Sequence, residues 1–178
     1  LKEVSFEQGT TRVADNLFAM CPGLESISIP EGVTAVEANA FYGCSNLASV
    51  SLPESLTEIQ GSAFNGCAKL ASVDIPDSVT KVEDWAFQDC SSLSSVRLSR
   101  SLVSLGAGAF GDDPISSIEI PASLEGCGSS SSGGPFGGCK QLKEVSFEQG
   151  TTHVADHLLY MCPGLESISI PEGVTAVE

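Results

Sequence analysis

Apolar residues recur along this chain with a period of 23 residues. In residues 47–69 they occupy places 1, 4, 6, 10, 13, 17, 18 and 21 of the unit, which are Leu47, Val50, Leu52, Leu56, Ile59, Ala63, Phe64 and Cys67. Most of the chain repeats this pattern. Cysteines at place 21 mark the same step, at Cys21, Cys44, Cys67 and Cys90 and again at Cys139 and Cys162. A fixed period of this length is the signature of a repeat protein.

The whole chain of 178 residues divides into such units, so we expect a single domain over residues 1–178. The units are residues 1–23, 24–46, 47–69, 70–92, 93–114, 115–141, 142–164 and 165–178. Residues 142–178 copy residues 1–37 with four changes, which indicates a block duplication. Because the last unit stops at place 14, we expect the chain to be part of a longer array.

Within a unit, the spacing predicts two short strands and one turn of helix. Inward places 4 and 6 alternate with polar places 3 and 5, which is strand spacing, so places 3–6 should form a strand. Proline, which lacks the N–H needed for a strand ladder, follows at place 7 in five units, at Pro30, Pro53, Pro76, Pro121 and Pro171. A second extended piece, such as residues 57–59, leads into a helical or 3-10 turn around Ala63 and Phe64.

One unit of this kind cannot cover its own apolar side chains, but stacked units can. The predicted fold is therefore an α/β repeat: a solenoid of about eight coils, with short parallel strands on one face and short helical or 3-10 turns on the flank. Its core should contain a continuous stack of rings from Phe41, Phe64, Phe87 and Phe110.

The repeat resembles a known family. The pattern L-x-x-V-x-L-P-x-S-L-T-x-I-x-x-x-A-F-x-x-C over residues 47–67 is similar to the BspA-type leucine-rich repeat of bacterial and protozoan surface proteins. The resemblance implies a curved, right-handed leucine-rich-repeat solenoid, an extracellular or cell-surface location and adhesive binding. The departures are local: Glu7, Ser99 and Glu148 replace the proline, and Asp113 replaces the cysteine.

Charge and hydropathy exclude two classes of partner. The chain has 8 Lys and Arg against 23 Asp and Glu, a formal net charge of −15, and no basic cluster. Nucleic acids and anionic membrane surfaces are therefore poor partners. No apolar run approaches the roughly 18 to 20 residues that a membrane-spanning helix needs. The given chain starts at Leu1 without Met or a basic-then-apolar stretch, so we expect it to be a mature segment or a cut fragment. We expect neither nucleic-acid binding nor membrane insertion.

The positions of the seven cysteines favour a packing role over a disulfide or a metal site. Six share place 21 beside the phenylalanine, where a thiol acts as a small hydrophobe, and Cys127 falls at inward place 13. A Cys127–Cys139 disulfide is the alternative. Zinc sites use ligands two to four residues apart, and no C-x-x-C occurs among the cysteines, so we expect no metal or cofactor.

Three other segments have a simple structural interpretation. His153 and His157, at variable polar places, are expected to be solvated. Asp89, Asp112 and Asp113 form a group that could attract Ca²⁺, but a solvated acidic edge is favoured because no calcium loop is evident. Residues 126–135, rich in Ser and Gly, are expected to form a flexible bulge.

The outward face is the candidate binding surface. Places 3 and 5 are mostly serine, and stacking turns them into columns. Asp74, Arg97 and Glu119 interrupt the place-5 column in three successive units, so Arg97 should reach an acid on either side. Tyr42 and Trp85, with Tyr160, occupy outward places elsewhere in the unit and are the alternative contact residues.

These observations predict a non-enzymatic, adhesion-type module that binds a protein or a glycan. The alternative is a structural stalk that holds other domains away from the cell. A catalytic set of nucleophile, base and orienting residue is not evident, so we expect no enzymatic activity. Because neither terminal unit carries an atypical polar cap, end-to-end self-association is also expected.

Overall fold

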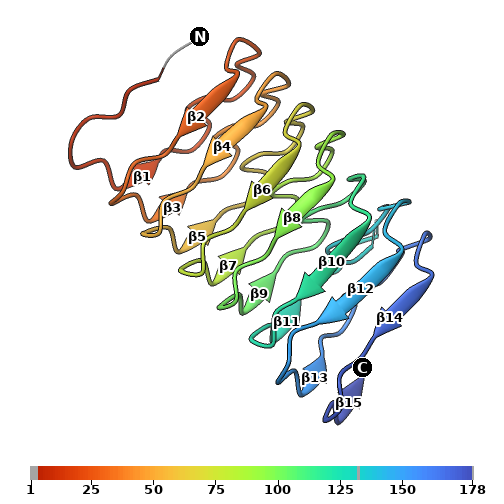
Figure 1. Ribbon diagram of the computed structural model, residues 1–178. Helices are drawn as coiled ribbons and strands as arrows, with labels where there is room; N and C mark the ends of the chain where they lie inside the picture. Colours follow the sequence, from red (N-terminus) through yellow and green to blue (C-terminus); the bar gives the residue numbers. More distant parts are fainter. Residues whose placement is uncertain (1–3, 132, 178) are drawn as a thin grey trace.

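The computed structural model describes residues 4–131 and 133–177, and it is a parallel-strand β-solenoid. Figure 1 shows the coils stacked from the N-terminus to the C-terminus, with the termini at opposite ends. Each coil after the first contributes one strand to each of two columns, so residues one repeat apart in the sequence lie side by side.

The first column contains the strands predicted at places 3–6. They are β2 (Ser26–Ser28), β4 (Ser49–Ser51), β6 (Ser72–Asp74), β8 (Ser95–Arg97), β10 (Ser117–Ile120), β12 (Glu144–Phe147) and β14 (Ser167–Ser169). The strands of this column pair in parallel, as in Ser26↔Ser49 of β2 and β4. The middle residue points into the core and its neighbours point outward, which confirms the predicted alternation.

The second column contains the second extended piece of each unit. Its strands are β1 (Arg12–Val13), β3 (Ala35–Val36), β5 (Glu58–Ile59), β7 (Lys81–Val82), β9 (Ser104–Leu105), β11 (Gly126–Cys127), β13 (His153–Val154) and β15 (Ala176–Val177). The first six form one parallel sheet, and β13 pairs with β15. The predicted extended piece at residues 57–59 is therefore confirmed at β5.

The predicted helical turn around Ala63 and Phe64 is wrong, because no helix occurs among the described residues. Ser62 and Gly66, on either side of these two residues, have left-handed backbones with φ of 55° and 72°. A right-handed helix cannot pass through such residues. The N–H of Phe64 instead donates to the carbonyl of Ala86 in the next coil, at 2.7 Å. The flank is thus a series of turns that are hydrogen-bonded from one coil to the next.

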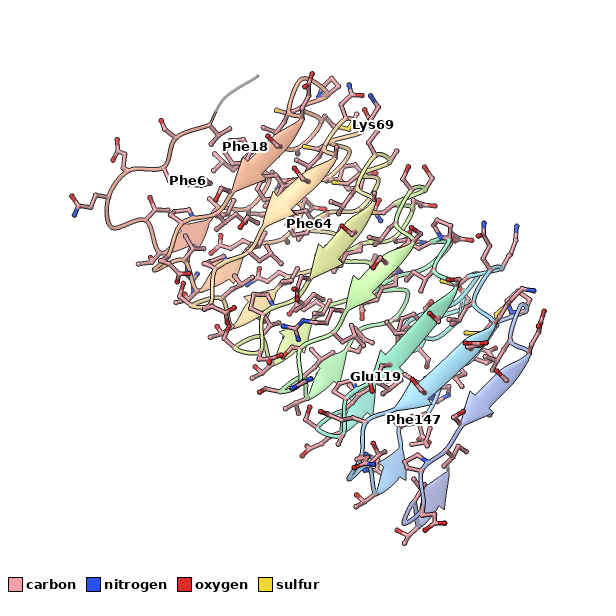
Figure 2. The ribbon with its side chains drawn as sticks, in the orientation of Figure 1. Phe6, Phe18, Phe64, Lys69, Glu119 and Phe147 are labelled. Atoms are coloured by element: carbon pink, nitrogen blue, oxygen red, sulfur yellow. The ribbon has the colours of Figure 1, made fainter. Side chains whose placement is uncertain are left out.

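The core is continuous along the array and contains the predicted ring stack. Phe64 lies between Phe41 and Phe87, with ring centroids 5.0 Å apart on each side and nearly parallel planes. Phe110 continues the stack at 5.2 Å. Phe18 and Phe136 extend it at the two ends, at 5.3 and 5.7 Å. Figure 2 labels Phe18 and Phe64 inside the coils.

The expected bulge at residues 126–135 is only partly observed. Residues 126 and 127 form β11, and Gly133, Gly134 and Pro135 are buried. The carbonyls of Gly134 and Pro135 accept from the N–H groups of Gly108 and Phe110, so this part rejoins the series of turns. Of the expected bulge, Ser132 lies outside the described residues.

Candidate functional site

The face of the first column is hollowed by a groove of about 660 Å³ that crosses β8, β10, β12 and β14. Serines at places 3 and 5 line most of it, as predicted: Ser95, Ser117, Ser146, Ser167 and Ser169. The groove also contains two carboxylates, Glu119 on β10 and Glu144 on β12. Figure 2 labels Glu119 on this column.

The carboxylates of Glu119 and Glu144 have no ion pair or hydrogen bond among the described residues. In the pairing of β10 with β12, Glu119 lies opposite Ser146 and Glu144 lies opposite Ser117. The two carboxylates are therefore diagonal neighbours on one face, with both side chains exposed. This part of the groove can accept hydrogen bonds or a positive group from outside.

The predicted charge cluster exists, but Arg97 reaches acids on one side only. Its Nε donates to Asp74 on β6 at 2.5 Å, and its Nη1 donates to Asp77 at 2.8 Å. No ion pair joins Arg97 to Glu119 among the described residues, which corrects the prediction. Both partners belong to the preceding coil, so Arg97 is already neutralised there and leaves Glu119 free.

Asp77 was not identified from the sequence. Its Oδ1 accepts from the N–H of Arg100 at 3.0 Å as well as from Arg97. These donors, Arg100 first, hold the pKa of Asp77 below its ordinary value. Asp77 occupies place 8 of its unit, next to the turn that brings it beside the following strand. The alignment of places 3 and 5 into columns does not include place 8.

A second groove of about 560 Å³ runs along the second column, and Trp85 lies in its lining. Trp85 is 41% exposed, as its outward place predicted. Tyr42 is 42% exposed but lines neither groove, and Asp74 lies outside both as well. The structure therefore divides the predicted contact residues between two surfaces.

Buried cysteines form a structural column. Cys44, Cys67, Cys90 and Cys139 are buried, and each thiol lies close enough to donate to a phenylalanine carbonyl of the coil before it, as Cys44 does to Phe18 at 3.1 Å. Burial raises the pKa of Cys139 to about 12. All seven cysteines are free, so the alternative Cys127–Cys139 disulfide does not form. Cys21, Cys127 and Cys162 are only half-buried, which corrects the expectation of uniform burial.

Asp113 takes the place of a cysteine in this column, and the expected solvated acidic edge is wrong for it. Its side chain is 1% exposed. One oxygen, Oδ1, accepts from the N–H of Cys90 at 2.8 Å, whereas Oδ2 is buried without a partner. Burial raises the pKa of Asp113 to about 10, so the group is a neutral acid at neutral pH. Asp89 and Asp112 are not buried.

The remaining candidate chemistry is dispersed. His157 is exposed, with its ring edge-on to Tyr160 at 5.9 Å, whereas His153 on β13 is half-buried rather than solvated. Among the described residues, no cluster of three or more His, Cys, Asp or Glu side chains could hold a metal ion. Nor does that part of the chain contain a helix of the length and hydropathy needed to span a bilayer.

The ends of the array carry exposed apolar side chains. Ile168 and Ile170 in the last coil are 41% and 44% exposed. At the other end, Phe6 packs edge-on against Phe18, with centroids 6.4 Å apart, and covers part of the first coil. End-to-end self-association stays a prediction.

Comparison with known proteins gives one family. Its sequence pattern, described as BspA type leucine rich repeat region (6 copies), matches residues 11–132 and 132–178. No curated protein matches the chain significantly.

The solved structures that are similar to the chain include two bacterial leucine-rich repeat proteins. The T. pallidum leucine rich repeat protein (TpLRR) is 32% identical with a TM-score of 0.71, over 82% of this chain and 65% of that one. A leucine-rich repeat protein from Bacteroides ovatus is 28% identical with a TM-score of 0.66, over 86% of this chain and 45% of that one. This chain thus spans about half to two thirds of their lengths. It belongs to the BspA-type leucine-rich repeat family.

Proposed function

We propose that this chain is a non-enzymatic binding module of a bacterial surface protein, and that it holds a protein or glycan partner on the face of its first column. The observation that carries the proposal is the groove across β8–β14. It is open, lined by serine hydroxyls, and contains Glu119 and Glu144 without partners in the described structure. Exposed polar groups without intramolecular partners can bind a partner without first breaking an ion pair or hydrogen bond within the chain.

The distribution of reactive groups supports a non-enzymatic role. The two histidines lie on the second column and its flank, whereas four of the cysteines are buried. A nucleophile, a base and an orienting group must lie within hydrogen-bond reach of one another. Membership of a family of surface repeat proteins supports the location, and it also supports adhesion as the outcome of binding.

A structural stalk is the second candidate, and the ring stack favours it. Six phenylalanines, from Phe18 to Phe136, form one uninterrupted column. A continuous core of this kind makes a stiff rod that could act as a spacer without any ligand.

Screening the purified chain against immobilised extracellular-matrix proteins and a glycan array separates the two candidates. The binding module predicts a ligand whose affinity falls about tenfold or more in the Glu119→Ala/Glu144→Ala double variant. Glu25→Ala/Glu54→Ala, which removes two carboxylates outside the groove, is the matched control and should bind normally. Arg97→Ala with Asp74→Ala tests the neighbouring charge cluster, whose loss should also weaken binding. A stalk predicts no ligand in either screen.

A further inference from the structure

The groove along the second column has the features of a carbohydrate site, and we infer that it binds a neutral oligosaccharide stacked on Trp85. Besides Trp85, the lining includes Asn39, Ser62, Lys81 and Glu83. The site lies along the second column, away from the groove of the first. It therefore goes beyond the proposed function, and either surface can bind without the other.

The lining of this groove changes at place 14. Units before it carry Glu37, Gln60 and Glu83 there. Each of these accepts from a main-chain N–H of the preceding coil, at 3.2, 3.2 and 3.0 Å. The next two units have Gly106 and Gly128 instead, and both line the groove. A Cβ added at Gly106 would lie 2.3 Å from a main-chain nitrogen of the preceding coil, so the coils approach closely there. The row of acidic and amide side chains therefore ends at Glu83.

Trp85 occupies a backbone position that does not suit it. Its φ is 57°, in the left-handed region where a bulky residue is rare. The equivalent place in other described coils holds Asn16, Asn39, Ser62, Gly108 and His157. In the next coil, a Cβ added at Gly108 would lie 2.9 Å from Cδ1 of the indole, so only glycine lets the ring lie there. The coil thus accommodates a large aromatic ring that remains 41% exposed.

This combination matches the chemistry of a sugar. The C–H groups on one face of a sugar ring carry partial positive charge and stack on the negative face of an aromatic ring. The hydroxyls need hydrogen-bonding groups, and the side chains of Asn39, Ser62 and Ser104 have no hydrogen bond among the described residues. An anchor for a protein partner would instead lie near the centre of a larger contact that excludes water.

The charge and the length of the groove restrict the class of sugar further. The ammonium of Lys81 is shared between Glu58 at 3.1 Å and Glu83 at 2.5 Å, and Asp84 adds a third carboxylate. Because acids outnumber bases here, sialylated or sulfated sugars are disfavoured. The lining extends over five coils, from Asn39 to Gly128. With coils about 4.8 Å apart, the groove fits several linked rings. Its 560 Å³ lies within the roughly 300–1,000 Å³ of typical ligand sites.

The chain has a single tryptophan, so its fluorescence reports on this groove alone. We would titrate the protein with neutral cello-, chito-, malto- and manno-oligosaccharides, and with sialyllactose and a heparin fragment as acidic comparators. At least one neutral oligosaccharide should shift the emission of Trp85 and protect it from acrylamide quenching. Neither acidic comparator should bind as well.

Calorimetry of variants with the oligosaccharide that binds then identifies the residues of the site. Trp85→Asn, which places a residue suited to the left-handed backbone, should weaken binding about tenfold or more. Tyr42→Ala removes an equally exposed ring outside the groove and should bind normally. If Trp85→Asn does not fold, as judged by circular dichroism, Asn39→Ala/Ser104→Ala should give the loss instead.

Three results would overturn the inference. The first is that no neutral oligosaccharide changes the emission at millimolar concentration. The second is that binding survives the loss of Trp85 or of both polar groups. The third is a protein partner that depends on Trp85 while every sugar fails, which would make the groove a protein site. The proposed function has its own test, because the Glu119→Ala/Glu144→Ala variant leaves this groove intact.

Discussion

Asp113 is the residue whose environment differs most from that of its counterparts. Every other full unit has a cysteine at this place, and the buried thiols donate to a carbonyl of the coil before them. A carboxylic acid at the same place has two oxygens to satisfy, and only Oδ1 has a partner. A buried polar atom without a partner costs about 1–3 kcal/mol. Asp113 is therefore a local weak point in the core.

We predict that Asp113→Cys raises the free energy of unfolding by about 1–3 kcal/mol at neutral pH. The new thiol would take the position of its neighbours, facing the carbonyl of Phe87. Urea unfolding of the variant and of the wild type measures the difference. Asp112→Asn, which removes the charge of the adjacent exposed carboxylate and suits its left-handed backbone, is the control and should change stability little. Equal stability of Asp113→Cys and wild type would show that Asp113 is not a weak point.

The same residue predicts a pH dependence. The pKa of Asp113 is raised to about 10 in the folded chain, against about 3.9 for an unfolded aspartate. Between these values the folded state holds one proton more than the unfolded state, so this residue makes stability fall as pH rises. The stability difference between Asp113→Cys and wild type should therefore be larger at pH 8 than at pH 5. A difference independent of pH would contradict the assignment of a neutral buried acid.

Thiol reactivity tests the cysteine column. Burial raises the pKa of Cys139 to about 12, and a hydrogen bond with Cys67, with burial second, raises the pKa of Cys90. Few thiolates form, so alkylation of the native protein should be slow at the buried cysteines and faster at Cys21, which is half-buried. Mass spectrometry after timed labelling identifies each site. Rapid native labelling of Cys67 and Cys90 would mean that the column is not closed.

At the scale of the element, one sequence adopts two structures within this chain. Residues 142–152 are identical to residues 1–11. In the later copy, Glu144–Phe147 form β12, which pairs with β10 on one side and β14 on the other. In the earlier copy, residues 4–7 form no strand and the segment leaves the array (Figure 1). The sequence is the same, so strand formation at these residues depends on pairing with neighbouring coils and not on the segment alone.

This dependence explains which parts of the structure could be predicted. Places 3–6 and 12–13 alternate or carry β-branched residues, so their strands follow from the spacing alone, as does the ring stack through Phe64. The turn at places 15–20 could not be predicted, because its left-handed residues, such as Ser62, are chosen by hydrogen bonds to the next coil. Arg97 selects Asp77 for a similar reason: the turn brings together residues that do not share a column.

The ring stack predicts the cost of removing one ring. Phe64 is fully buried between two parallel rings, so Phe64→Ala should lower the free energy of unfolding by about 3–5 kcal/mol. Hydrogen exchange should show that the loss spreads to neighbouring coils, because each coil is covered only by the next. Phe6→Ala, at the partly exposed end of the array, should cost much less. A loss under about 1 kcal/mol at Phe64 would contradict the continuous core.

At the scale of the whole molecule, the repeat separates stability from recognition. The inward places repeat with few exceptions and make one core, whereas the outward places vary from coil to coil and make two different grooves. The groove of the first column is distinguished by unpartnered carboxylates, and that of the second column by Trp85 and by glycines at place 14. The glycines are visible when the units are aligned, but only the stacking shows that Gly106 and Gly128 line the same groove as Trp85.

Carboxyl footprinting of the chain, with and without a partner found by screening, tests the central claim most directly. Carbodiimide coupling followed by mass spectrometry reports how accessible each carboxylate is. The account predicts that the partner protects Glu119 and Glu144, whereas Glu25 and Glu54 react equally in both samples. Unchanged labelling of Glu119 and Glu144 in the complex would contradict it, because the partner would then bind elsewhere on the solenoid.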